Sequence, residues 1–114
     1  METKENLKIL RIFISSTDKF KFRPLYEVIV YAAKRYKLAG ATVFQGMMGY
    51  GGDSPVYVRS SWEIIERRPL IIEIIDEETK LNEFMGILKT YFEKSKNECI
   101  VTMEDVKVVY YKIK

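Results

Sequence analysis

Residues 7–14 read LKILRIFI, a run of branched and aromatic side chains that predicts a β-strand. Successive side chains of a strand point to opposite faces of its sheet, so the run separates into two sets. One set is entirely apolar and consists of Leu10, Ile12 and Ile14. The other set is apolar except for one arginine and consists of Leu7, Ile9, Arg11 and Phe13. This pattern differs from the regular apolar–polar alternation of a strand with one solvated face.

Two amphipathic helices are predicted on either side of the chain's middle. Pro24 suits the first turn of a helix, where a missing N–H costs nothing. Apolar residues then recur at helical spacing, at Leu25, Val28, Ile29, Ala32 and Tyr36. We expect this helix to end at Gly40, because glycine enters the left-handed C′ conformation without strain. We expect Asp76 to cap the second helix. The apolar stripe of that helix consists of Leu81, Phe84, Met85, Leu88 and Phe92.

Three further strands complete the order of elements. Residues 41–45 (ATVFQ) and, after Pro69, residues 70–75 (LIIEII) lie between the helices. Residues 99–103 form a short apolar piece, and residues 106–111 (VKVVYY) predict the last strand. The order is strand, helix, strand, strand, helix, strand. It predicts a ferredoxin-like α+β fold, a single domain over residues 1–114, with both helices on one face of a four-stranded antiparallel sheet. The hairpin between the helices argues against the alternative, an open α/β sheet.

The face of the predicted sheet opposite the helices is too apolar to be exposed to solvent. In this topology residues 7–14 and 70–75 are central neighbours, and the second strand splits into Leu70, Ile72 and Ile74 against Ile71, Glu73 and Ile75. The all-apolar sets should lie beneath the helices. We expect a homo-oligomer to bury the opposite face, with Arg11, Phe13 and Glu73 in the interface and Arg11 paired with Glu73. The alternative is a partly exposed sheet that carries an incidental ion pair.

A glycine-rich segment separates the two middle strands. Residues 46–55 contain four of the six glycines, Gly46, Gly49, Gly51 and Gly52. Glycines allow consecutive backbone N–H groups to converge on an anion, and a long hairpin loop is usually functional or disordered. Basic side chains that could add contacts to phosphate are Arg59, Arg67 and Arg68 downstream and Lys19 and Lys21 after the first strand. The alternative is a flexible hairpin tip with solvated charges, and the spacing fits neither common phosphate-binding fingerprint.

Composition excludes several classes of protein. The formal net charge is +3, and basic residues alternate with acidic ones, so we expect no nucleic-acid partner. The chain has no histidine and one cysteine, which excludes zinc fingers and catalysis that depends on histidine. The carboxylates Asp76, Glu77 and Glu78 are better explained by a helix start than by a metal site. No apolar run is long enough to span a bilayer, and we expect a cytoplasmic protein without direct membrane insertion.

Seven stretches in order resemble a family of uncharacterised PII-like proteins, the domain of unknown function 190. They are residues 10–14 (LRIFI), 18–19 (DK), 24–27 (PLYE), 38–43 (LAGATV), 46–51 (GMMGYG), 69–76 (PLIIEIID) and 101–106 (VTMEDV). The resemblance implies a ferredoxin-like homotrimer in which residues 46–61 correspond to the effector loop of PII proteins. It also implies an adenine nucleotide, AMP, ADP or ATP, in clefts between subunits. The loop would control a protein partner, and the family's association with fluoride channels suggests a membrane transporter or channel.

This chain departs from the family pattern at residues 54–57 (SPVY), where the family has small, basic and histidine residues. The leading hypothesis is a PII-like regulatory protein that binds an adenine nucleotide. The alternative is a metal-responsive protein resembling the copper-tolerance group, against which the lack of histidine counts. A small enzyme that uses Glu73 or Asp76 is disfavoured because no clustered acid–base set is evident, so we expect no enzymatic activity and no cofactor beyond the nucleotide.

Overall fold

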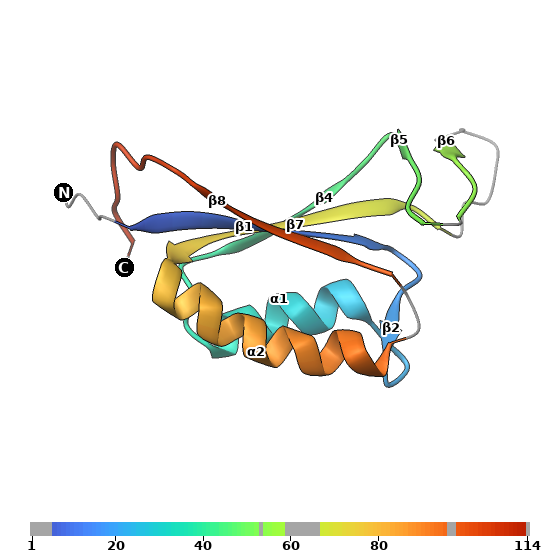
Figure 1. The fold of residues 1–114 in the computed structure, drawn as a ribbon, viewed down its shortest axis with the longest axis horizontal. Helices are drawn as coiled ribbons and strands as arrows, with labels where there is room; N and C mark the ends of the chain where they lie inside the picture. Colours follow the sequence, from blue (N-terminus) through green and yellow to red (C-terminus); the bar gives the residue numbers. More distant parts are fainter. Residues whose placement is uncertain (1–5, 53, 59–66, 96–97, 114) are drawn as a thin grey trace.

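The fold is one four-stranded antiparallel sheet covered by two helices. The computed structural model describes residues 6–52, 54–58, 67–95 and 98–113. The sheet has the strand order β4-β7-β1-β8. Its strands are β1 (Leu7–Ser15), β4 (Ala41–Gln45), β7 (Pro69–Glu77) and β8 (Ile100–Asp105). Helices α1 (Leu25–Arg35) and α2 (Glu78–Lys94) lie side by side on one face of it (Figure 1). The predicted ferredoxin-like α+β architecture is confirmed.

Two short hairpins lie outside the main sheet. One pairs β2 (Lys19–Phe20) with β3 (Arg23–Pro24), and it lies on the helix side of the molecule in Figure 1. The other pairs β5 (Met48–Gly49) with β6 (Tyr57–Val58) and projects beyond the opposite face. The second hairpin belongs to the chain between β4 and β7, so the glycine-rich segment is held at one end of the sheet.

The core lies between the sheet and the helices. The all-apolar faces of β1 and β7 are buried, as predicted: Leu10, Ile12, Ile14, Leu70, Ile72 and Ile74 are each at most 7% exposed. From the helices, Leu25, Ile29, Leu81, Phe84 and Leu88 complete the same cluster. Tyr36, at the end of the predicted first stripe, is partly exposed, and its ring lies 5.9 Å from that of Phe84. No helix among the described residues is long and apolar enough to cross a membrane.

The last strand is not where the sequence placed it. The prediction of a strand at residues 106–111 is wrong, since β8 is Ile100–Asp105 and pairs with Lys8–Phe13 of β1. The register explains the difference. Asp105 already lies opposite Lys8, close to the first residue of β1, and Val106 N–H reaches only the carbonyl of Leu7 at 3.5 Å. Beyond that point β1 offers no partner, so high β-propensity alone does not extend the ladder.

The predicted end of the first helix at Gly40 is also wrong. Helix α1 ends at Arg35, and Lys37 takes the left-handed conformation with φ 60°. Leu38 N–H donates to Ala33 O at 3.1 Å and Lys37 N–H donates to Lys34 O at 3.0 Å, which is the Schellman pattern of a helix C-terminus. Leu38 and Ala33 are both buried in the core. The hydrophobic contact of this motif therefore fixes the end of the helix at Arg35, five residues before the glycine.

Asp76 does not cap the second helix. It is the next-to-last residue of β7, and the N-cap position belongs to Glu77, whose side chain makes no capping hydrogen bond. The buried Asp76 carboxylate instead accepts hydrogen bonds from Ala39 N–H at 2.9 Å and from Glu77 N–H at 2.7 Å. Its role is to tie the connection between α1 and β4 to the end of β7.

The uncovered face of the sheet has an apolar row next to a polar one. Strand register aligns Phe44, Ile71, Phe13 and Ile100 across all four strands, and we call these four residues the apolar row. Phe44 is 49% exposed, Phe13 37% and Ile100 65%. In the adjacent row, Arg11 Nε lies 2.8 Å from Glu73 Oε2, so these two residues pair as their strand positions predict. Arg11 also forms an ion pair with Glu104.

Candidate functional site

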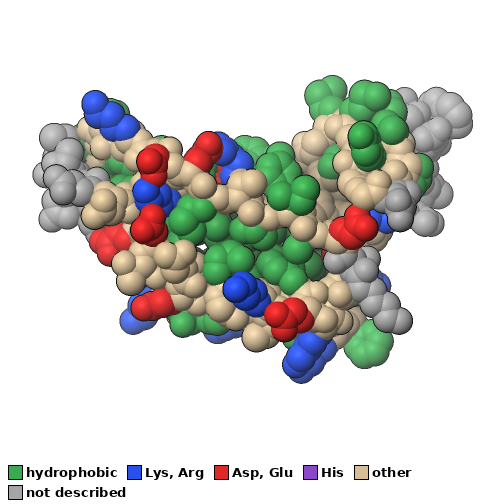
Figure 2. Space-filling view, in the orientation of Figure 1, with side chains coloured by type: hydrophobic (Ala, Val, Ile, Leu, Met, Phe, Trp, Pro, Cys, Tyr) green, Lys and Arg blue, Asp and Glu red, His purple; other side chains and the backbone are tan. Residues whose placement is uncertain are grey.

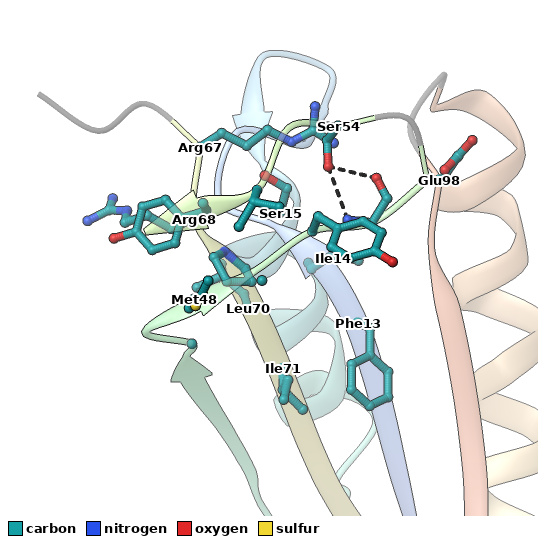
Figure 3. Close-up of a pocket in the computed structure, with 18 of the residues that line it drawn as sticks. Phe13, Ile14, Ser15, Met48, Ser54, Arg67, Arg68, Leu70, Ile71 and Glu98 are labelled. Carbon is teal, nitrogen blue, oxygen red and sulfur yellow. Dashed lines mark hydrogen bonds between the residues drawn. The ribbon is translucent and has the colours of Figure 1, made fainter. Parts of the chain in front are cut away.

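The glycine-rich segment folds into a short hairpin with a tight turn. Strands β5 and β6 are joined by two residue pairs, Met48 with Val58 and Gly49 with Tyr57. At the turn, Ser54 Oγ accepts a hydrogen bond from Gly51 N–H at 3.0 Å and donates one to Gly51 O at 2.7 Å (dashed lines in Figure 3). Gly52 has φ +54°, a conformation that favours glycine. The turn therefore depends on the residue types that the sequence supplies there.

Two contacts anchor this segment to the sheet. Gly46 N–H donates to Pro69 O at 2.8 Å. A Cβ atom on Gly46 would lie 2.9 Å from Cγ of Pro69, so the close approach requires glycine at this position. On the other side, Ser16 N–H donates to Arg68 O at 2.8 Å, and Arg68 N–H donates to Ser16 Oγ at 2.9 Å. These bonds fix the start of β7 and the two arginines that precede it.

A cavity of about 580 Å³ lies between the hairpin and the uncovered face of the sheet. Figure 3 shows Phe13 and Ile71 along the central strands and Ser54 and Arg67 toward the other end of the lining. The two ends differ in chemistry. Phe13, Ile71 and Leu70 supply apolar walls, whereas Arg67 and Arg68 are exposed and carry positive charge. A cavity of this size with apolar walls and a few polar groups is typical of a small-molecule site.

The cavity gathers most of the predicted anion-binding residues. Those that line it are Gly46, Gly49, Gly51, Gly52, Arg67 and Arg68. Lys19 and Lys21 do not line it, because they belong to the β2–β3 hairpin on the helix side of the molecule. The Lys21 ammonium instead lies 5.4 Å from the centre of the Phe20 ring. Arg59 lies outside the described residues. Of the predicted interface residues, Phe13 lines the cavity, and the Arg11–Glu73 pair lies in the neighbouring row.

The lining also contains polar residues that were not predicted as site residues, among them Ser54, Tyr57 and Glu98. Tyr57 is the most informative, because it is only 9% exposed. Among the described residues, its buried hydroxyl has no hydrogen-bond partner. Such an unsatisfied group costs about 1–3 kcal/mol. The one sequence signal for this position was the departure from the family pattern at residues 54–57.

Asp18 is a buried carboxylate close to this end of the sheet. It is 2% exposed, and its Oδ2 accepts a hydrogen bond from Ser15 N–H at 2.9 Å. Burial raises the pKa of Asp18, while the Ser15 N–H and the positive charge of Arg67 oppose that rise. Burial, helped by the Asp18 charge, also raises the pKa of the Cys99 thiol. Cys99 therefore stays protonated at neutral pH and is a poor nucleophile.

We predict that Asp18→Asn flattens part of the dependence of stability on pH. Because the pKa of Asp18 is higher in the folded than in the unfolded chain, the folded state binds more protons between the two values, and stability falls as pH rises through that window. Asparagine keeps an oxygen for the Ser15 N–H but has no charge to bury. Urea unfolding from pH 4 to 7 should show the variant gaining stability relative to the wild type as pH rises. Parallel curves would contradict this account.

Metal ligands are not clustered in the part of the chain that the structure describes. No group of three or more Cys, Asp or Glu side chains there is arranged to hold a metal ion, and the sequence contains no histidine. The lining of the cavity offers arginine side chains, glycine backbone N–H groups and hydrophobic walls, which are groups of the kind that bind anions and apolar rings.

Comparison with known proteins gives a consistent set of relatives. A family model described as DUF190, "Uncharacterized ACR, COG1993", matches residues 7–108. A UPF0166 protein of Aquifex aeolicus is 36% identical over 103 residues, which are 90% of this chain and 93% of the relative. A UPF0166 protein of Methanocaldococcus jannaschii is 33% identical over 101 residues, which are 89% of this chain and 90% of the relative.

Solved structures share the fold at low sequence identity. A PII-like signaling protein from Thermus thermophilus has a TM-score of 0.64 and 23% identity, and the match covers 90% of this chain and 89% of the other. CPII, a nitrogen regulatory PII-like protein from Thiomonas intermedia, has a TM-score of 0.66 and 17% identity, with 93% and 96% covered. That structure contains ADP, AMP and bicarbonate. At these identities the likeness establishes a PII-like fold.

Proposed function

The chain belongs to the DUF190 family, and from that premise we propose that it is a PII-like regulatory protein rather than an enzyme. It binds a small effector, an adenine nucleotide such as AMP, ADP or ATP, and passes the bound state to a protein partner through its glycine-rich segment. We propose that it does so in the cytoplasm. The nucleotide in the related CPII structure supports this choice of effector.

The observation that carries the proposal is the cavity between the β5–β6 hairpin and the sheet. Its apolar walls suit a flat base, and Arg67 and Arg68 suit a phosphate group at the exposed end. The hairpin itself forms one wall, so a bound ligand contacts the segment that must change for a signal to be sent. An order–disorder or positional change of such a segment is a common form of switch.

We propose that the functional unit is a homotrimer that buries the uncovered face of the sheet. The apolar row supports this, because Phe44, Phe13 and Ile100 are large hydrophobic side chains exposed side by side in the single chain. Three members of the row, Phe13, Ile71 and Ile100, also line the cavity. A second copy that covers the row therefore lies next to the ligand, which suits a site between subunits.

The hairpin also carries the features expected of a docking surface for another protein. Large hydrophobic side chains gather over β5 and β6, as Figure 2 shows at the upper right. They are Met47, Met48, Tyr50, Val56 and Val58, each at least 54% exposed. Exposed apolar clusters of this kind mark interaction sites. We propose that the partner, a membrane transporter or channel, contacts the hairpin here.

Titration calorimetry with AMP, ADP and ATP tests the proposed ligand. We expect wild-type protein to bind at least one of them, and Arg67→Gln to weaken that binding about tenfold, because a charge-assisted hydrogen bond to phosphate is lost. Lys21→Gln is the matched control, since Lys21 lies on the other side of the sheet, and its binding should change less than about twofold. If none of the three nucleotides binds to the wild type, the proposed function is wrong.

A further inference from the structure

Tyr57 lines the cavity, but none of the nucleotide contacts proposed above involves it. It belongs to β6, pairs with Gly49 of β5 and lines the cavity. The residue is 9% exposed, and its hydroxyl is shut off from solvent. Within the described parts of the chain, no donor or acceptor reaches that hydroxyl. Buried polar groups in native proteins nearly always have a partner, so this hydroxyl points to a partner that is bound only in the working state.

The arginines of the cavity are exposed, whereas Tyr57 is buried. This difference limits which part of a ligand can contact the Tyr57 hydroxyl. Arg67 and Arg68 are exposed and carry the positive charge. Phosphate oxygens are costly to desolvate and belong with these arginines near solvent. A neutral ring is the part of a nucleotide that enters apolar surroundings at low cost. A buried, neutral phenol is therefore better matched to the ring than to the phosphate.

We propose that the Tyr57 hydroxyl forms a hydrogen bond with the edge of the bound base and thereby determines which base the site accepts. This inference rests on the proposed nucleotide function. A site that hydrogen-bonds one polar edge rejects a ligand lacking it, because its own buried group is then left unpaired. Tyr57 is thus a specificity-determining residue. The arginines contribute affinity for any ligand that carries a phosphate group.

The local structure allows the base to reach this hydroxyl. Among the described residues, two pairs join β6 to β5. The turn between them contains Gly52 with its positive φ, and Gly51 has open space around its Cα. A small shift of β6 would therefore break few of these bonds, and the proposed contact requires such a shift to bring the hydroxyl into the cavity. Closure of the hairpin over the base would then satisfy a group that is unpaired without ligand.

The test compares Tyr57→Phe with Tyr31→Phe, using AMP and ribose 5-phosphate as probes. Tyr31 is an exposed residue of α1 and does not line the cavity, so loss of its hydroxyl should change AMP affinity less than twofold. Tyr57→Phe should weaken AMP binding about tenfold and leave ribose 5-phosphate binding unchanged within twofold. Without ligand, the variant should unfold at the same or a higher denaturant concentration than the wild type, because an unsatisfied group has been removed.

The outcomes separate this inference from the function on which it rests. If wild-type protein binds no adenine nucleotide, the proposed function is wrong and this inference is lost with it. If the wild type binds AMP and Tyr57→Phe binds it equally well, only the role of Tyr57 is overturned. Equal weakening of AMP and ribose 5-phosphate would also overturn it, because the hydroxyl would then contact the sugar or phosphate. A Tyr57→Phe variant with a smaller assembly mass would assign the hydroxyl to a subunit contact instead.

Discussion

Phe13→Glu should convert the assembled protein into monomers. Phe13 lies in the centre of the uncovered face, between Ile71 of β7 and Ile100 of β8, and it is 37% exposed in the single chain. Full burial of such a side chain contributes roughly 1.5–3 kcal/mol, so burying the exposed third of Phe13 contributes roughly 0.5–1 kcal/mol per subunit, and a trimer would contain three copies. The substitution removes this contribution and adds three carboxylates to an apolar interface, where an unpaired charge is strongly unfavourable. Light scattering at micromolar concentration measures the change in mass.

Tyr31→Glu is the matched control for the Phe13 variant. It also replaces an aromatic residue by a carboxylate, but Tyr31 is an exposed residue of α1, and that helix covers the other face of the sheet. We expect this control to keep the mass of the wild type. A wild-type protein that is monomeric at micromolar concentration, or a Phe13→Glu variant that keeps its assembled mass, would show that the uncovered face is not the subunit interface.

Gly46→Ala should destabilise the protein and misplace the glycine-rich segment. The added Cβ would lie 2.9 Å from Cγ of Pro69, a ring atom that cannot rotate away. Overpacking of this kind typically costs about 1–3 kcal/mol. It also strains the hydrogen bond from Gly46 N–H to Pro69 O, which joins the segment to β7. We expect a lower free energy of unfolding in urea together with weaker AMP binding.

Gly51→Ala is the matched control for Gly46→Ala, because it replaces a glycine of the same segment that has no close neighbour at the Cβ position. Nothing lies within 4 Å of a Cβ atom at Gly51, so this variant should change stability by less than about 0.5 kcal/mol. Equal losses of stability in the two variants would mean that chain flexibility, rather than contact with Pro69, makes glycine necessary in this segment.

The periodicity of the sequence correctly predicted which face of each central strand and of each helix is buried. Alternation in β1 assigned Ile12 to the core and Phe13 to the uncovered face, and both assignments hold because a strand's period of two admits no drift. The helix stripes succeed because residues three and four apart lie on the same face of a helix. The position of Arg11 opposite Glu73 followed from the strand order, and the register places them as neighbours.

The failures all involve partners that lie far away in sequence. Residues 106–111 have strand-forming side chains, but strand length is set by where β1 begins. Asp76 resembles a helix cap, but its carboxylate accepts a hydrogen bond from Ala39 N–H instead. Gly40 is a good helix terminator, but the contact of Leu38 with the core ends the helix earlier. In each case, tertiary contacts outweigh a local preference of about 1 kcal/mol or less.

The glycines and arginines of the candidate site could be predicted from the sequence, and the rest of its lining could not. Gly46 and Arg67 could be predicted because a cluster of glycines followed by arginines is recognisable in the sequence alone. Tyr57 gives no such signal, because its importance arises from burial and from an unsatisfied hydroxyl, and both depend on the folded hairpin. Lys19 and Lys21 failed to join the cavity because the β2–β3 hairpin turns to the helix side of the sheet.

Residues shared by the apolar row and the cavity couple two equilibria. In the proposed trimer, Phe13, Ile71 and Ile100 would face both a second copy and the ligand. If a neighbouring subunit completes the cavity wall, assembly raises nucleotide affinity, and by thermodynamic reciprocity the nucleotide promotes assembly to the same degree. Apparent affinity then increases with protein concentration. A regulator built in this way responds to its own abundance as well as to its effector, so that a low copy number would itself silence the signal.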